Sequence, residues 1–397
     1  MISVKAKRMI NQINPINELL NITEGVISFA GGLPSLDLLE SHAIYEIMTK
    51  TNLNELNSIL QYGEIEGDFT LRQMISKRAL EYGIHTTPAE IVITSGATQG
   101  IDFVSELFIN SEDYILVDQY SFVSAIEIFK SYGAIIIPVQ SDENGIIIDD
   151  LEKKLKEFSP KFIYIVPNYN NPTGFSLSME RRERLLDIIH GFEVFIIEDD
   201  PYLELYYEDS YLPPLKALDK KSKVIYLSSF SKTISPGLRV GYMIGNSDMK
   251  STVIKLKENK DIHTSNLSQF LVLEFLKGDF EKHLDILRQS YKQKRDVMDY
   301  YLKYYLGSLI RYSIPTGGMF FWIKLQKGID SMQLLKETLK HGVTFIPGQS
   351  FCTDFTDDSA GYLRLNFTNP DEHEIKQGLE VISRCIEGLI SQPALYK

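Results

Sequence analysis

The sequence has 397 residues, of which 44% are hydrophobic and 24% are charged, a composition typical of a folded globular protein. The formal net charge is −12, so the surface lacks the positive field with which proteins bind nucleic acids or anionic membranes. Two cysteines and seven scattered histidines form no metal-binding pattern, and no apolar stretch is long enough for a signal peptide or a membrane span. We therefore expect a cytoplasmic protein with no metal site and no nucleic-acid or membrane partner.

The first predicted elements are a helix and a series of buried strands. Asp68 can cap a helix over residues 70–82, which Gly83 can end. Short apolar runs then alternate with amphipathic segments, as strands alternate with crossover helices. Most runs show no polar alternation, which is typical of a parallel sheet covered by helices on both faces. The predicted strands are residues 91–94, 114–117, 135–139, 162–166, 194–198, 224–227 and 240–244.

The rest of the chain predicts more helices and a smaller α+β unit. Ser178 can cap a helix over residues 180–190, and a long helical stretch covers 265–305. Further strands are predicted at 311–314, 320–323, 344–346 and 362–367, with helices at 331–340 and 371–390. The expected fold class is α/β: a large domain with a mostly parallel seven-stranded sheet between helices, and a smaller α+β domain. We place an N-terminal segment at 1–45, the large domain at 46–290 and the small domain at 291–397, with a site in the cleft between the domains.

The most informative stretch is residues 228–242, which follows a predicted strand and contains several hydroxyls, Lys232 and Arg239. A lysine alone in a loop usually points to water. Here hydroxyls and an arginine accompany it at the carboxyl edge of a parallel sheet, a combination that predicts an anion pocket with an amine inside. A lysine whose pKa is lowered by nearby positive charge can form a Schiff base.

Two further motifs lie at predicted strand ends. Residues 168–174, with the sequence NYNNPTG, can be an ordinary turn, because Asn, Pro and Gly are typical turn residues. Residues 198–202, with the sequence EDDPY, can solvate a loop, cap a helix or hold a metal. Each motif is ambiguous when taken by itself.

In combination, the three motifs resemble the fold type I pyridoxal 5′-phosphate enzymes, specifically the class I and II aminotransferases. The similarity is to the branch that contains 2-aminoadipate and kynurenine aminotransferases and the effector domains of MocR-type regulators. The motifs follow one another in the order of that family: an Asn-Pro-Thr-Gly turn, an Asp-x-x-Tyr strand end, Ser-x-Ser-Lys and Pro-Gly-Leu-Arg. The resemblance extends from Phe29 to Arg364, nearly the whole chain.

The resemblance implies a role for each motif residue. Lys232 would form the Schiff base with pyridoxal 5′-phosphate and act as general base, with Asp199 and Tyr202 completing the catalytic set. Asp199, with Asp200 as the alternative, would keep the pyridine nitrogen protonated. Asn171 and Tyr202 would bind the phenolate oxygen of the ring, on which Tyr120 would stack. The expected phosphate contacts are Ala97, Thr98, Ser229, Ser231 and Arg239.

The substrate contacts and the assembly follow from the same resemblance. Arg364 interrupts an apolar strand with a cation, so a carboxylate should meet it, and the family implies the substrate α-carboxylate. Asn171 and Gly32 are the other expected substrate contacts. Residues 13–39 are expected to close over the substrate and set specificity. Tyr62 is expected to reach the phosphate of a neighbouring subunit, which implies a homodimer.

The expected function is transfer of an amino group from an aromatic or 2-aminoadipate-like α-amino acid to a 2-oxo acid, with 2-oxoglutarate as the expected acceptor, by a ping-pong mechanism. A lyase or decarboxylase on the same scaffold stays open, because the motifs predict the electron-withdrawing cofactor site but do not predict which reaction follows there. The effector-binding part of a MocR-type regulator is a further alternative. It is disfavoured because the residues before Phe29 leave no room for a winged-helix domain.

Overall fold

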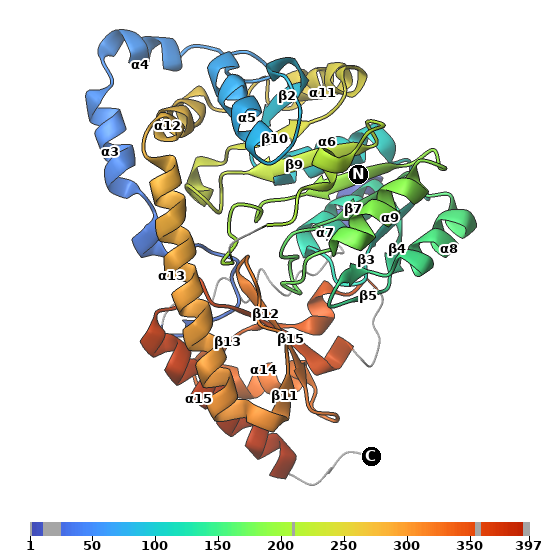
Figure 1. Cartoon of the computed structure of the whole chain (residues 1–397), viewed down its shortest axis with the longest axis vertical. Coiled ribbons are helices and arrows are strands. Elements are labelled where there is room, and N and C mark those ends of the chain that lie inside the picture. The colour runs from blue at the N-terminus through green and yellow to red at the C-terminus, as the bar shows by residue number, and fades with distance from the viewer. Residues whose placement is uncertain (1, 11–24, 209–210, 354–358, 392–397) are drawn as a thin grey trace.

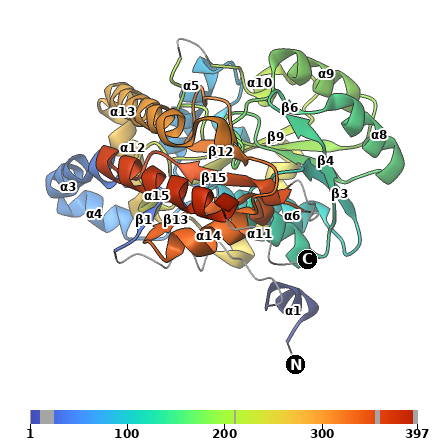
Figure 2. The ribbon, with the colours of Figure 1, turned by 90° about the horizontal axis from the view of Figure 1, so that it is seen from below.

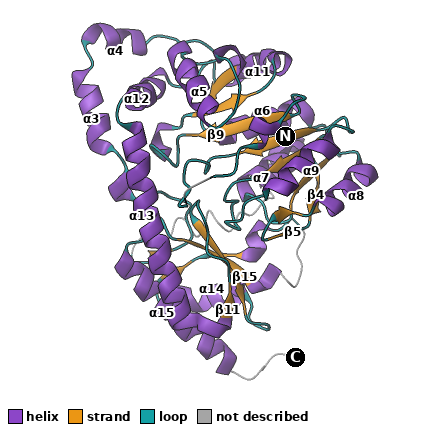
Figure 3. Cartoon of the chain, viewed as in Figure 1, coloured by secondary structure: helices purple, strands orange, loops and turns teal. Residues whose placement is uncertain are grey.

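The computed structural model describes residues 2–10, 25–208, 211–353 and 359–391. Its largest element is a seven-stranded sheet with the order β2-β10-β9-β8-β7-β3-β4 (Figures 1 and 3). Strand β10 runs antiparallel to the other six strands, which share one direction, so the predicted seven-stranded and mostly parallel sheet is confirmed. Its strands are β2 (Ile91–Thr94), β3 (Tyr114–Asp118), β4 (Ile135–Val139), β7 (Phe162–Ile165), β8 (Phe195–Asp199), β9 (Val224–Ser229) and β10 (Gly241–Ile244).

The strand β7 explains why helices cover both faces of this sheet. Phe162 and Tyr164 belong to one hydrophobic cluster, and Ile163 and Ile165 belong to another. Since successive side chains of a strand point to opposite faces, an unbroken apolar run needs a cover on each face. On the Phe162 face lie α6 (Ala97–Phe108) and α7 (Val123–Tyr132), and on the other lie α8 (Ile148–Phe158), α9 (Met179–Ile189) and the short α10 (Leu215–Leu218).

Two predicted helix starts are confirmed by their caps. Before α5 (Phe69–Glu81), the side chain of Asp68 accepts a hydrogen bond from the Leu71 N–H at 2.8 Å. Before α9, the Ser178 hydroxyl accepts one from the Arg181 N–H at 3.4 Å. Each cap satisfies an N–H that has no partner within its helix. Gly83, just past α5, has a φ of 80°, which L side chains rarely adopt, so the helix ends there.

The predicted helical stretch at 265–305 is divided in the structure. It consists of α12 (Asn266–Lys277) and α13 (Phe280–Tyr301), which continues as one π-helical turn, η4 (Leu302–Leu306). Gly278 adopts a non-helical conformation between α12 and α13, in keeping with the low helix propensity of glycine. Helix α13 runs along one side of the molecule from the large sheet to the smaller one (Figure 1). The domain boundary expected at residue 290 falls inside this continuous helix and stays a prediction.

A four-stranded antiparallel sheet forms the centre of the smaller unit. Its order is β11-β12-β15-β14, and α14 (Ser331–Leu339) and α15 (Glu372–Ser391) pack beside it (Figure 2). The strands are β11 (Ile310–Arg311), β12 (Phe320–Leu325), β14 (Ile346–Pro347) and β15 (Tyr362–Asn366). The predicted strand at 344–346 is in fact two strands in different sheets. The first, β13 (Val343–Thr344), pairs in parallel with β1 (Ile27–Ser28) from the N-terminal segment.

The remaining elements lie mainly at the periphery. Helices α3 (Ser41–Lys50) and α4 (Leu53–Ile59) extend from one corner of the molecule (Figure 1). The others are α1 (Val4–Ile10), α11 (Ser247–Lys260), and the hairpin of β5 (Ser141–Asp142) and β6 (Gly145–Ile146). In the described part of the chain, no helix combines the length and the apolar character that a membrane crossing requires.

Candidate active site

A cavity of about 290 Å³ lies where β7, β8 and β9 end and the smaller unit begins. The carboxyl edge of a parallel sheet is the usual place for a ligand in an α/β protein. All the predicted site residues line this cavity except Tyr120 and Tyr62. The predicted residues in its wall are Gly32, Ala97, Thr98, Asn171, Asp199, Tyr202, Ser229, Ser231, Lys232, Arg239 and Arg364.

The amine of Lys232 is set up as a nucleophile. Its Nζ donates a hydrogen bond to the Gly32 carbonyl oxygen at 2.7 Å. The pKa of Lys232 is lowered to about 8, mainly by burial and then by the positive charges of Arg364 and Arg239, while Asp199 opposes the shift. A larger fraction of the amine is therefore unprotonated at neutral pH than in an exposed lysine.

Asp199, the last residue of β8, presents one carboxylate oxygen that has no partner. Its Oδ2 accepts a hydrogen bond from the Tyr164 hydroxyl at 2.7 Å, whereas its Oδ1 is buried and unpaired. Burial raises the pKa of Asp199 to about 6, so the group is still mostly ionised at pH 7. A buried acceptor without a donor is costly, so this oxygen fits an N–H of a bound group. The pyridine N–H of pyridoxal 5′-phosphate is such a donor.

The neighbouring Asp200 does not line the cavity. Its Oδ2 accepts a hydrogen bond from Asn168 Nδ2 at 3.0 Å, and Asn168 is in turn held by the buried Arg182 at 2.8 Å. The geometry therefore favours Asp199 over Asp200 as the partner of a ring nitrogen. Tyr164, which orients Asp199, is a residue that the sequence analysis missed.

A set of hydrogen-bond donors forms an anion cup at the start of α6. Ala97 and Thr98 open the helix, where the backbone N–H groups have no partner within the helix and attract anions. The Ser229 and Ser231 hydroxyls lie 2.7 Å apart, and Arg239 Nη1 lies 3.4 Å from the Ser231 hydroxyl. These donors suit the dianionic phosphate of the expected cofactor.

Glycine is required where this cup begins. Gly96 has a φ of 83°, and a Cβ there would lie 2.4 Å from Nη2 of Arg239. Any side chain at this position would both strain the backbone and displace the arginine. The sequence therefore keeps this corner of the cup open with the one residue that fits.

Arg364 lies in the middle of β15 and points into the cavity wall from the smaller unit. Its Nη1 donates to Asn171 Oδ1 at 2.6 Å, its Nη2 donates to the Ala30 carbonyl oxygen, and its Nε has no partner. Burial lowers the pKa of Arg364 to about 10, so it is charged at neutral pH. Since no carboxylate among the described residues pairs with it and its hydrogen-bond partners are uncharged, this cation fits the carboxylate of a substrate.

Tyr202 and Asn171 form one polar wall of the cavity. Burial raises the pKa of the Tyr202 hydroxyl, and the positive charge of Arg364 and a weaker effect of the side-chain hydrogen bond with Asn171 only partly oppose that shift. The Tyr202 hydroxyl is therefore neutral and can donate a hydrogen bond. Both side chains are placed where they could bind the same oxygen of a ligand.

The expected stacking of Tyr120 on the cofactor ring needs a correction. The Tyr120 ring is buried against Trp322, at 5.0 Å between ring centroids, and Tyr362, at 5.7 Å, and its backbone forms a bridge to Cys352. These contacts with the smaller unit turn it away from the cavity, which it does not line. Phe122, two residues further on and directly before α7, lines the cavity instead. Phe122 follows the end of β3 as Tyr120 does, and this position in the sequence was the signal that could have identified it as a residue of the cavity wall.

Tyr62 lies outside the cavity of its own chain. Its side chain is 76% exposed, and its ring meets the edge of His263 at 5.8 Å between centroids. A role at the phosphate of a second chain therefore stays a prediction. Of the segment expected to set specificity, residues 13–24 lie outside the described residues, whereas Gly32 and Leu33 line the cavity.

The fold and site define an enzyme that holds a phosphorylated cofactor beside a nucleophilic lysine. The family described as aminotransferase class I and II matches residues 24–382, and the chain belongs to that family. The resemblance inferred from the motifs is therefore confirmed: this is a pyridoxal 5′-phosphate-dependent aminotransferase of fold type I.

Comparisons with individual relatives agree over nearly the whole chain. A 2-aminoadipate transaminase from Thermus thermophilus is 34% identical, with 96% of this chain and 95% of that protein covered. The structure of an α-aminoadipate aminotransferase from the same species, with N-(5′-phosphopyridoxyl)-L-leucine, has a TM-score of 0.91 at 34% identity, with 98% of each chain covered. A kynurenine aminotransferase structure from Pyrococcus horikoshii has a TM-score of 0.92 at 32% identity, with 99% and 98% covered.

Proposed function

We propose that this aminotransferase moves the amino group of an aromatic or 2-aminoadipate-like α-amino acid to 2-oxoglutarate in two half-reactions of a ping-pong cycle. One observation carries the site assignment: a single cavity contains the amine of Lys232, the unpaired Oδ1 of Asp199 and the buried cation of Arg364. The choice of donor is supported by the names of the relatives. The apolar side chains of Leu33, Phe122 and Phe351 in the cavity wall also suit an aromatic donor.

Each residue has a defined task in this proposal. The bound cofactor supplies an electron sink and carries the amino group between the two half-reactions. Asp199 Oδ1 accepts the N–H of the pyridine ring and stabilises its positive charge. The Lys232 amine would accept the proton of the substrate Cα as a general base and then, as a general acid, donate it to the cofactor carbon on the other side of the shared nitrogen. Asp199 thereby keeps the ring electron-withdrawing, while Lys232 carries out the proton transfer.

The other residues of the cavity bind and orient. Arg364 fixes the α-carboxylate of the substrate, with Asn171 beside it and the Gly32 backbone opposite. Asn171 and Tyr202 bind the phenolate oxygen of the ring, and Phe122 covers its face. The start of α6, the two serines and Arg239 hold the phosphate. These contacts place the Cα proton next to the Lys232 amine.

A panel of amino acids tests the reaction type. Purified protein loaded with the cofactor is mixed with each amino acid, and conversion of the cofactor to its amine form is followed by absorbance. We expect conversion with aromatic amino acids and 2-aminoadipate, release of the matching 2-oxo acid, and reversal by 2-oxoglutarate. Absence of conversion with every amino acid would overturn the proposal. Carbon dioxide, or ammonia with pyruvate, would instead indicate a decarboxylase or a lyase.

A second measurement tests the central residue separately. Borohydride reduction of the loaded protein, followed by peptide mapping, should fix the cofactor on Lys232, and the variant Lys232→Ala should capture none. Cofactor on any other lysine would contradict the assignment even if the reaction type is right.

A further inference from the structure

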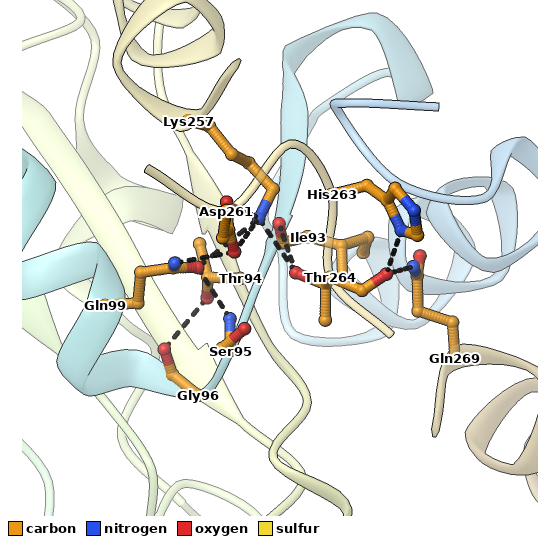
Figure 4. A network of polar contacts seen from close by, with 10 residues as sticks. All are labelled: Ile93, Thr94, Ser95, Gly96, Gln99, Lys257, Asp261, His263, Thr264 and Gln269. Atoms are coloured by element: carbon orange, nitrogen blue, oxygen red, sulfur yellow. Dashed lines mark hydrogen bonds and ion pairs between the residues drawn. The ribbon is translucent and has the colours of Figure 1, made fainter. Parts of the chain in front are cut away.

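A buried polar network adjoins the turn at Ser95 and Gly96, which comes immediately before the anion cup in the sequence (Figure 4). At its centre is Lys257 in α11, whose side chain is completely buried. Its Nζ lies 2.9 Å from Asp261 Oδ2, 2.9 Å from the Thr264 hydroxyl and 3.4 Å from Gln99 Oε1. Burial lowers the pKa of Lys257, and Asp261 opposes that shift. A buried ammonium needs this full set of partners, so the group is held in one place.

Gln99 connects this ion pair to the cup. It lies on α6 just after Thr98, and its Nε2 donates to Asp261 Oδ2 at 2.8 Å. Its Oε1 accepts the backbone N–H of Ser95 at 2.8 Å. The Ser95 carbonyl oxygen accepts from Arg239 Nη2 at 3.3 Å. Ser95 is therefore held from both sides, immediately before Gly96 and the first amides of the helix.

The other end of the network is fixed to the body of the large sheet. The Thr264 hydroxyl donates to the Ile93 carbonyl oxygen of β2 at 3.3 Å. The Thr264 carbonyl oxygen accepts from Gln269 Nε2 at 2.7 Å, and Gln269 Oε1 accepts the Asp68 N–H at 2.8 Å. The turn at Ser95 is thus tied through side chains to a strand and to the start of another helix.

We propose that Gln99, Asp261 and Lys257 are positioning residues for the cofactor phosphate. They keep the turn at Ser95 and Gly96 in the conformation that directs the Ala97 and Thr98 amides at the phosphate. None of the three lines the cavity, so they act through the backbone of Ser95 and touch neither cofactor nor substrate. These three residues therefore strengthen the binding of the phosphate group, and they do not affect the binding of the cofactor ring.

Two ligands that differ only in the phosphate separate this role from general damage. The dissociation constants of pyridoxal 5′-phosphate and of pyridoxal are measured for the apo-protein by fluorescence quenching. For Gln99→Leu we expect the dissociation constant of pyridoxal 5′-phosphate to rise about tenfold, which corresponds to the loss of about one good hydrogen bond. The dissociation constant of pyridoxal should stay within about twofold of that of the unmodified protein. Inorganic phosphate should compete with pyridoxal 5′-phosphate more weakly in this variant. The ³¹P resonance of the bound cofactor should also shift.

The same two helices provide a matched control. Lys260 of α11 contacts Asp102 and Glu106 of α6, so it joins the same helices away from the cup. Lys260→Met should leave both dissociation constants unchanged. If Lys260→Met weakens cofactor binding as much as Gln99→Leu does, or if Gln99→Leu weakens pyridoxal and its phosphate equally, the proposal is wrong.

A milder variant covers the case in which Gln99→Leu does not fold. Gln99→Glu keeps an acceptor for the Ser95 N–H and for Lys257, but loses the donor to Asp261. We expect a several-fold weakening for pyridoxal 5′-phosphate that pyridoxal does not share. Affinities equal to those of the unmodified protein, or an equal loss for both ligands, would contradict a positioning role.

Discussion

Lys232 has its low pKa mainly because it is buried, and then because the positive charges of Arg364 and Arg239 oppose its protonation. Below pH 8 most of the amine is protonated and cannot attack, so the rate of cofactor capture by the apo-protein should fall as the pH drops through about 8. Arg364→Met removes one of the positive charges that lower the pKa. The midpoint of capture should therefore move upward by roughly 1 pH unit. Stopped-flow absorbance at a series of pH values measures both midpoints.

Arg311→Met serves as the control for this experiment, because Arg311 is exposed at the edge of the smaller sheet. Its midpoint should match that of the unmodified protein. An unchanged midpoint in Arg364→Met would show that the arginine charge does not tune the lysine.

Among the elements, the antiparallel strand β10 is the one that limits the space beneath the anion cup. A Cβ on Gly241 would lie 2.6 Å from the Gly96 carbonyl carbon and 2.7 Å from the Ala97 N. Both are backbone atoms, which cannot move aside as a flexible side chain can. Gly241→Ala should therefore lower the free energy of unfolding by about 1–3 kcal/mol and weaken cofactor binding. Denaturant unfolding and cofactor titration measure the two effects.

Gly388 in α15 provides the opposite case. A Cβ there meets no atom within 4 Å, so Gly388→Ala should stabilise the protein by about 0.5–1 kcal/mol through helix propensity and leave cofactor binding unchanged. Equal stability of the two variants would contradict the steric argument for Gly241.

The elements also show which features can be read from the sequence. The strands of the large sheet were predictable because residues such as Phe162 and Ile163 form unbroken apolar runs, and the lysine motif was predictable from its spacing. The division of residues 343–347 into two strands was not, because β13 exists through its pairing with β1, far away in the chain. The position of the Tyr120 ring likewise depends on Trp322 and Tyr362, which only the folded chain brings close.

On the scale of the whole molecule, the exposed apolar side chains point to a second copy of the chain. Tyr45, Met48, Leu53 and Leu60 on or just after α3 and α4 are each more than half exposed, and so is Tyr62. Clustered exposed apolar residues usually mark an interface. We therefore expect a homodimer in sedimentation experiments, with Tyr62 completing the phosphate site of the partner.

Mixed dimers test this sharing of Tyr62. Tyr62→Leu and Lys232→Ala should each have low activity as pure dimers. In a hybrid of the two, the subunit with an intact Lys232 would receive an intact Tyr62 from its partner, so one complete site would form. Activity should then appear on mixing under conditions that exchange subunits. Absence of recovery, with hybrid formation verified by differently tagged chains, would place Tyr62 in the site of its own chain.

The pairing of β1 with β13 has a consequence for synthesis on the ribosome. Ile27 is made early, but its partner Val343 follows about 300 residues later. At roughly 5–20 residues per second, the N-terminal segment waits about 15 to 60 s before its strand partner exists. Until then Phe29, which is completely buried in the finished protein, has no place to pack. Ile27 and Ser28 thus leave the ribosome long before they reach their final position, and a nascent chain stalled before residue 343 should still expose this strand to proteases.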